Sequence, residues 1–267
     1  MRILKNDLRR AVAHRGFLWA ALALAALMYF GGYEEVHSER ATDLLAHLET
    51  MLGMGPMSWA FPAFGALCYA DAYVKDAQTG SLSYQMYRMG PSAYVLSKTA
   101  ACFLSACLAT MVGITLYTLG ISTRFSALFY QGNLPAYESV INSFDALVVE
   151  GRYVLYMFMH ILCESLAAGM WAVVGLALSC IWPNVYMAFI APGVILYVKD
   201  YICAWLHVPF LQILRDYQLG YVTRVPGILL PAAMVFGLFA GISLALAAGM
   251  TVVIRGKERG FFRRSSG

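Results

Sequence analysis

Long apolar stretches separated by short polar intervals run through almost the whole chain. The pattern predicts six membrane-spanning helices, because most of the stretches approach or exceed the roughly 20 residues that cross a bilayer as a helix. Their expected bounds are 16–33, 56–74, 93–121, 153–181, 185–199 and 226–254. The second span contains Pro62, where we expect a kink. The predicted fold is an all-α integral membrane protein with one transmembrane domain over residues 1–267.

The first fifteen residues combine an apolar stripe with basic side chains. Apolar residues recur at positions 3, 4, 8 and 12, which lie on one face of a helix, and arginine and lysine flank that face. This pattern is typical of a helix that lies in the membrane surface. The residues of this interfacial helix that we expect to matter most are Leu4, Leu8, Arg9 and Arg10.

A polar hairpin, residues 75–92, separates the second and third spans. Its centre, from Gly80 to Met89, predicts a short amphipathic helix outside the membrane. On the other side of the membrane, residues 34–49 predict an acidic amphipathic helix and residues 122–152 an ordered loop rich in aromatic residues. Residues 200–225 alternate too often between apolar and polar for a full crossing, so we expect a re-entrant or interfacial segment there.

Composition supports the membrane assignment. Hydrophobic residues make up 60% of the chain, charged residues only 13%, and the mean hydropathy is +0.64. Soluble domains average about 45–50% apolar and about 25% charged residues. The six cysteines lie in apolar stretches without a Cys-x-x-Cys pair, so we expect core residues rather than a metal site or disulfides.

The distribution of charge predicts an orientation. With both termini and the 71–98 interval on one side, that side holds thirteen of the nineteen lysines and arginines. Ten acidic residues lie on the other side and four on this one, and Glu164 lies within a predicted span. The positive-inside rule therefore places both termini and the hairpin in the cytoplasm of a bacterial-type plasma membrane.

Catalytic motifs are missing from the sequence. It contains no Gly-x-x-x-x-Gly-Lys-Ser/Thr phosphate-binding loop, no His-Glu-x-x-His and no Gly-x-Ser-x-Gly. The pair Glu34-Glu35 with Arg40 resembles the Glu-Glu-x-x-x-Arg motif of CAAX-type membrane proteases. The spacing is one residue too long, which turns Arg40 about 100° around a helix. We therefore expect no catalysis by this chain, no cofactor in it and no nucleic-acid partner.

Two intramembrane features remain. Glu164 is the one carboxylate deep in a predicted span, so it is a candidate for an intramembrane polar site, and a structural hydrogen bond explains it equally well. The sixth span carries small residues at four-residue spacing, which allow a second helix to approach closely. These helix-packing residues are Ala233, Gly237, Gly241, Ala245 and Gly249.

The order of these parts resembles the permeases of type-2 ABC exporters. The closest match lies in the hairpin, where an acidic residue is followed by a glycine four residues on, an arginine, a Pro-Ser pair and a lysine that enters the third span. In this chain those residues are Asp76, Gly80, Arg88, Pro91, Ser92 and Lys98. The match departs from the family in having Asp76 where glutamate is commoner.

The resemblance implies a half-transporter. Two copies of this chain, or one copy and a related permease, would pair in the membrane, and two copies of a separate ATPase, which holds ATP and Mg²⁺, would bind from the cytoplasm. The hairpin helix would be the coupling helix, and the interfacial helix would be the connecting helix beside it. The ATPase-coupling residues would be Asp76, Gly80, Ser81, Tyr84, Gln85, Tyr87 and Arg88. Exporters of amphipathic peptides, such as phenol-soluble modulins or bacteriocins, fit this size best.

Three other functions stay open at this point. An ion-coupled secondary carrier would use Glu164, although the chain lacks the repeated halves expected of many carriers. A membrane protease or lipid transferase lacks a catalytic set with usable spacing. An assembly or anchoring subunit would need no transport activity of its own.

Overall fold

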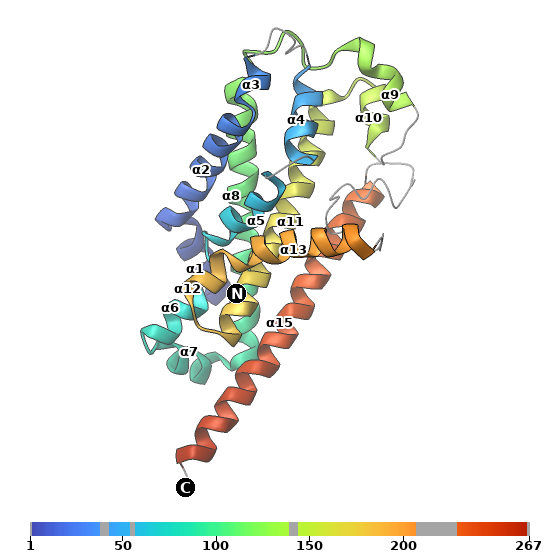
Figure 1. Cartoon of the computed structure of the whole chain (residues 1–267). Helices are drawn as coiled ribbons and strands as arrows, with labels where there is room; N and C mark the ends of the chain where they lie inside the picture. Colours follow the sequence, from blue (N-terminus) through green and yellow to red (C-terminus); the bar gives the residue numbers. More distant parts are fainter. Residues whose placement is uncertain (1, 38–42, 54–56, 139–143, 207–228, 266–267) are drawn as a thin grey trace.

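The computed structural model describes residues 2–37, 43–53, 57–138, 144–206 and 229–265, and these residues form helices joined by turns (Figure 1). One isolated bridge, between Asp43 and Ala127, is the β-type pairing among them. The helices are α1 (Arg2–Val12), α2 (Arg15–Gly31), α3 (Tyr33–Val36), α4 (Leu44–Gly53), α5 (Met57–Ala66), α6 (Ala72–Gln78), α7 (Ser81–Met89), α8 (Pro91–Ile121), α9 (Leu134–Glu138), α10 (Asp145–Val149), α11 (Tyr153–Ile181), α12 (Val185–Phe189), α13 (Ala191–Leu206) and α15 (Leu229–Ser265). A 3₁₀ turn, η1 (Gln131–Asn133), precedes α9.

Three of the described helices, α8, α11 and α15, are long and apolar enough to cross a membrane. A fourth crossing is formed if α1 and α2, which meet at a bend of 49°, act as one broken span. The described part of the chain is therefore an all-helical bundle, and three of its helices could span a membrane. The expectation of six spans is met only to this extent.

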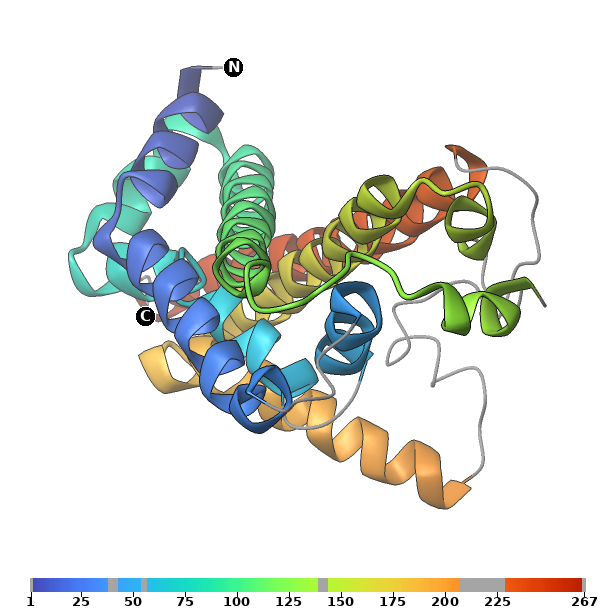
Figure 2. The ribbon, with the colours of Figure 1, turned by 90° about the horizontal axis from the view of Figure 1, so that it is seen from above.

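Helices α8 and α11 form the core of the bundle. In its most apolar window α11 is 78% buried and α8 is 61% buried, whereas α15 is only 28% buried. Figure 1 shows α2 packed against α8, and α5 seated between α2, α8 and α11. Helices α6 and α7 lie at one end of this bundle, and α3, α9 and α10 lie at the other. The view from above also shows α5 lying among α2, α8 and α11 (Figure 2).

The predicted second span is not one helix. Helix α5 ends at Ala66, a turn occupies residues 67–71, and α6 begins at Ala72. Pro62, the expected kink, lies inside α5. The regular helical hydrogen bonds end instead after Ala66. There the Leu67 N–H is shared between two carbonyls, and the Cys68 N–H bonds the carbonyl of the residue three positions earlier instead of four. This turn directs Tyr69 toward the polar cluster described below, so the break has a role in the fold.

The predicted fifth span is also broken. Helix α12 ends at Phe189 and α13 starts at Ala191, and both views show α13 lying across the long helices rather than along them (Figures 1 and 2). Pro192 supplies the physical reason, because it has no N–H to bond the carbonyl of Ala188 in a continuous helix. Residues 200–206, which we predicted to be broken, continue α13, and residues 207–225 lie outside the described residues.

Close helix packing in this structure uses other glycines than those predicted. A Cβ added to Gly237, Gly241 or Gly249 would meet no described atom within 4 Å. A Cβ on Gly113 would lie 2.9 Å from the carbonyl oxygen of Ala21 in α2. A Cβ on Gly175 would collide with the carbonyl of Ala188 in α12. The stripe on α15 faces no described part of this chain, so its contact with another helix stays a prediction.

We expect Gly175→Ala to destabilise the fold by about 1–3 kcal/mol, because the added methyl would clash with the backbone of Ala188 and the ring of Pro192. Gly241→Ala is the matched control in a similar helical position, and it should be neutral or slightly stabilising, since alanine favours helix over glycine. Thermal unfolding of both variants in detergent measures the difference. Equal melting temperatures for the two variants would contradict the packing at Gly175.

Candidate functional site

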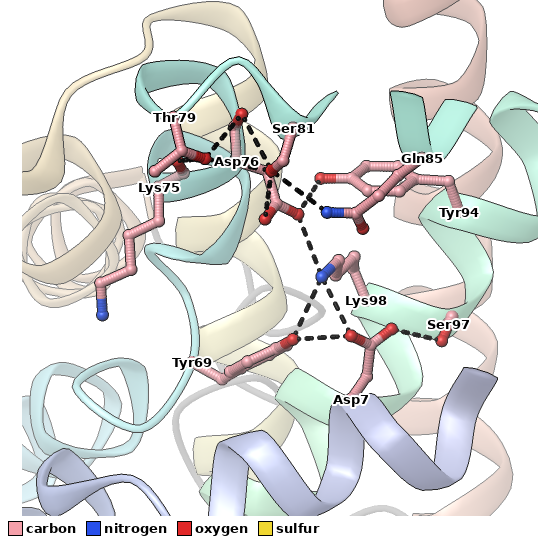
Figure 3. Close-up of polar contacts among 10 residues, drawn as sticks. All are labelled: Asp7, Tyr69, Lys75, Asp76, Thr79, Ser81, Gln85, Tyr94, Ser97 and Lys98. Carbon is pink, nitrogen blue, oxygen red and sulfur yellow. Dashed lines mark hydrogen bonds and ion pairs between the residues drawn. The ribbon is translucent and has the colours of Figure 1, made fainter. Parts of the chain in front are cut away.

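The side chain of Lys98 is buried near the start of α8 and holds three partners (Figure 3). It is 3% exposed, and its Nζ lies 3.0 Å from Oδ1 of Asp7 and 3.0 Å from Oδ2 of Asp76. It also donates to the hydroxyl of Tyr69 at 3.2 Å. An ammonium group has three N–H donors. These three acceptors therefore satisfy the buried lysine completely.

Asp7 fastens α1 to the bundle. Its Oδ1 accepts a hydrogen bond from the Tyr69 hydroxyl at 3.0 Å, and its Oδ2 accepts one from the Ser97 hydroxyl at 2.6 Å. The carboxylate is 5% exposed. Asp7 is the only acidic residue among the first fifteen, and that isolation in a basic segment was the signal from which its role could have been predicted.

The face of α1 that packs on the protein is not its apolar stripe. Asp7 and Ala11 are buried, whereas Leu4 is 37% exposed and Leu8 is half-buried. Arg9 and Arg10 are exposed, as expected of a helix with basic flanks. Leu4 and Val12 of the predicted stripe are thus left exposed, as lipid contact would require.

Asp76 fastens the α6–α7 hairpin to the same lysine. Its Oδ2 accepts from the Tyr94 hydroxyl of α8 at 2.9 Å, and its Oδ1 accepts from the Ser81 hydroxyl at the start of α7 at 3.2 Å. Gln85 Nε2 donates to Ser81 Oγ at 3.2 Å, one turn along α7 (Figure 3). The positive φ of Gly80, 69°, makes the turn between the two helices and favours glycine there.

We refer to Asp7, Tyr69, Asp76, Tyr94, Ser97 and Lys98 as the Lys98 junction. It joins α1, the 67–71 turn, α6 and α8 through side chains that are almost entirely buried. Burial raises the pKa of Asp76, but the attraction of Lys98 and the hydrogen bonds from Lys98 and Tyr94 outweigh that effect, and the net result is a pKa below the ordinary value. Asp76 is therefore held as a carboxylate.

The predicted coupling residues divide between two faces of α7. Ser81 and Gln85 turn inward to the junction, and Met86 packs against the core. Tyr84 and Tyr87 are 68% and 95% exposed, and Arg88 is also exposed. Helix α7 thus has an anchored inner face and an uncovered outer face made of two tyrosines and an arginine.

The last helix also reaches this end of the bundle. Arg255 Nη2 of α15 donates to the hydroxyl of Ser92 in the first turn of α8 at 2.7 Å. Ser92 is one of the residues of the family-like hairpin motif, and it follows Gly90 and Pro91, which begin α8. The basic end of α15 is therefore linked to the point where the hairpin enters the bundle.

A second polar network lies at the opposite end, around α4. Asp43 accepts from the backbone N–H of Leu45 at 3.0 Å and so caps α4, and it accepts from the side-chain amide of Asn133 at 2.8 Å. Glu49 accepts from the hydroxyls of Tyr137, at 2.7 Å, and Tyr156. Burial raises the pKa of Glu49 in spite of these two hydrogen bonds, and nearby Asp145 adds to the rise. This network holds α4 against the loop elements η1 and α9 and against α11.

Glu164 lies buried in α11, 6% exposed, one turn after the equally buried His160. The structure assigns no hydrogen-bond partner to Glu164 Oε2 or to His160 Nε2 among the described residues. The structural hydrogen bond considered for Glu164 is therefore not found at that oxygen. Among the described side chains, no group of three or more His, Cys, Asp or Glu is arranged to hold a metal ion.

Comparisons of this chain with models of known protein families, with curated proteins and with solved structures found no match.

We expect Lys98→Met to destabilise the protein by about 3–5 kcal/mol, because it leaves two buried carboxylates without their cation. The matched control is the triple variant Lys98→Met, Asp7→Asn and Asp76→Asn, which removes the carboxylate charges as well and should recover most of the loss. Unfolding of the purified protein in detergent gives both values. A Lys98→Met protein as stable as the wild type, or a triple variant less stable than the single one, would contradict the charge balance of the junction.

Acid should remove the contribution of Asp76. Because its pKa in the fold is below the ordinary value of about 3.8, the carboxylate stabilises the fold at pH values above that figure, and the stabilisation is lost as the pH falls through the lowered pKa. The stability gap between wild type and Asp76→Asn should be constant from neutral pH down to that figure and shrink below it. A gap that widens in acid would contradict this assignment.

Proposed function

We propose that this chain is the transmembrane permease subunit of an ATP-driven ABC exporter and that it moves a hydrophobic or amphipathic cargo, best a peptide, out of the cytoplasm. ATP and Mg²⁺ are bound by a separate ATPase, two copies of which associate with a pair of permeases. The observation that carries the proposal is the Lys98 junction. The number of continuous spans does not carry it, since two predicted spans are broken.

The junction has the connectivity that a coupling device requires. An exporter must transmit movement from a soluble motor to helices within the membrane. Asp76 joins the hairpin to Lys98 at 3.0 Å, and Lys98 belongs to α8, one of the long apolar helices. Asp7 joins α1 to the same ammonium at 3.0 Å. A push on the hairpin therefore reaches α8 and α1 through buried, charge-assisted bonds rather than through a mobile loop.

The outer face of α7 is suited to a protein partner. Tyr84, Tyr87 and Arg88 lie there, and tyrosine and arginine are among the residues that contribute most to binding at interfaces. The inner face is fixed by Ser81 and Gln85, so docking on the outer face does not require α7 to leave the bundle. In this proposal the ATPase docks on these three side chains.

Transport then follows from a two-state change. Closure of the ATPase pair on ATP would favour one orientation of the unit formed by α1, the hairpin and α8, and hydrolysis would favour the other. We infer the class of cargo from the side chains of the helices. The most buried helix, α11, carries apolar, Met and aromatic residues with few charges, which suits a hydrophobic or amphipathic cargo. The uncovered small-residue stripe of α15, with Gly237 and Gly241, is available for the second permease.

Docking is tested by co-purification with a candidate ABC ATPase. We expect Tyr87→Ala with Arg88→Glu to weaken the association at least about thirty-fold, the effect of losing a residue worth about 2 kcal/mol at an interface. Ser83→Ala, also on the exposed side of α7, is the matched control and should bind normally. Undiminished association of the double variant, with the ATPase still bound, would remove α7 from the docking surface.

A second candidate function, an ion-coupled carrier, is favoured by one observation. Glu164 is buried within a long apolar helix and one of its oxygens has no described partner, which is the setting of proton-carrying carboxylates in transporters. If the exporter proposal holds, Glu164→Gln should leave ATP-dependent transport in proteoliposomes nearly unchanged. Loss of transport driven by a pH gradient in that variant, without any ATPase, would instead support the carrier.

A further inference from the structure

A cavity of about 70 Å³ lies beside the Lys98 junction, between α1, the 67–71 turn, α6 and α8. Buried side chains form its inner side, namely Tyr69, Asp76 and Lys98. Exposed basic side chains form its open side, namely Arg10, His14 and Lys75. Figure 3 shows Lys75 extending away from Asp76 rather than into the junction. The cavity thus opens through a basic rim.

The carboxylates around the cavity are already paired. Asp7 and Asp76 both bind Lys98, and Asp71 binds Lys75 at 2.8 Å. Arg10 has no hydrogen bond or ion pair with a described residue. His14 Nδ1 accepts a hydrogen bond from the Gly16 N–H at 3.0 Å, so the ring of a neutral histidine carries its proton on Nε2. Arg10, the Nε2 of a neutral His14 and the N–H groups of Lys75 that do not bind Asp71 are therefore the donors left at the rim.

We infer that this cavity holds the phosphate group of an anionic membrane lipid. A cavity of this size exceeds the roughly 10–15 Å³ that admits a single water molecule, so it has room for one tetrahedral phosphate. Arg10 offers a planar pair of N–H donors for phosphate oxygens, and His14 and Lys75 add further donors. Helix α2 starts at the edge of the cavity and exposes Leu18 and Leu22, which gives acyl chains an apolar surface.

The expected position of the cavity on the cytoplasmic side of the membrane agrees with a lipid ligand. The lysine and arginine distribution predicts that α1 and the hairpin lie on the cytoplasmic side, where anionic headgroups attract basic segments. A bound lipid would contact α1 through Arg10 and the hairpin through Lys75, the two elements that Lys98 already joins. The inference concerns binding alone and does not depend on the exporter proposal.

The test is retention of lipid by the full-length protein. The protein is purified from mixed micelles that contain phosphatidylglycerol and phosphatidylcholine, and native mass spectrometry counts the bound lipids. We expect preferential retention of phosphatidylglycerol, and we expect Arg10→Gln with Lys75→Gln to weaken it about fivefold for each cation removed. Arg124→Gln is the matched control, because Arg124 is exposed and does not line the cavity.

Each outcome decides the proposal. Loss of the lipid in the double variant, with Arg124→Gln unchanged, supports it, and elution of both variants as folded protein excludes a general defect. Equal retention in all three proteins overturns it. Binding of inorganic phosphate by the wild type, without preferential retention of phosphatidylglycerol, would support a phosphate site but overturn the lipid as its source.

Discussion

The ammonium group of Lys98, held between the carboxylates of Asp7 and Asp76, is the interaction on which the described structure depends most. Moving an ion out of water costs several kcal/mol, and only well-placed opposite charges and hydrogen bonds offset that cost. Here all three N–H groups are used, and the four oxygens of the two carboxylates accept from hydroxyls as well. The partners come from α1, the 67–71 turn, α6 and α8. Separating any one of these elements would therefore leave a buried charge or polar group in the others without its partner. They are expected to move together.

The breaks in the helices bring side chains to the buried ammonium of Lys98 and its carboxylate partners. A continuous helix over residues 56–74 would not turn Tyr69 toward Asp7 and Lys98, whereas the turn after Ala66 does. The bend of 49° between α1 and α2 likewise lets α1 leave the direction of α2 and bring Asp7 to the start of α8. At the other end, hydrogen bonds to Asp43 and Glu49 hold α4 in a comparable way, so a polar network lies at each end of the α8–α11 core. The middle of the bundle relies on close packing at glycines such as Gly113 and Gly175.

The sequence predicted the class of fold and several parts of the site for clear physical reasons. Uninterrupted apolar stretches identified α8, α11 and α15, and the hairpin motif singled out Asp76 and Lys98, which the structure joins. The coupling residues that the resemblance implied included Ser81, which donates to Asp76, and Gln85, which donates to Ser81. Asp7 was missed because its partner is ninety-one residues away, and a single charge in a helix carries no periodicity. The breaks at 67–71 and at Pro192 were missed because apolar content continues through both, while the backbone hydrogen bonds do not. Apolar content indicates whether a segment prefers lipid to water. It does not show whether the helix is continuous, because continuity requires each backbone N–H to bond the carbonyl four residues earlier.

The central claim, that Lys98 makes α1 and the hairpin one unit with α8, is tested most directly by hydrogen exchange of the protein in nanodiscs. Wild type, Lys98→Met and Tyr156→Phe are compared, the last of which disturbs only the network around α4. The account predicts that Lys98→Met speeds exchange in α1 and α6 together and leaves α4 unchanged, and that Tyr156→Phe does the reverse. Faster exchange in α6 with α1 still protected in Lys98→Met would contradict the account, because the two elements would then be held independently.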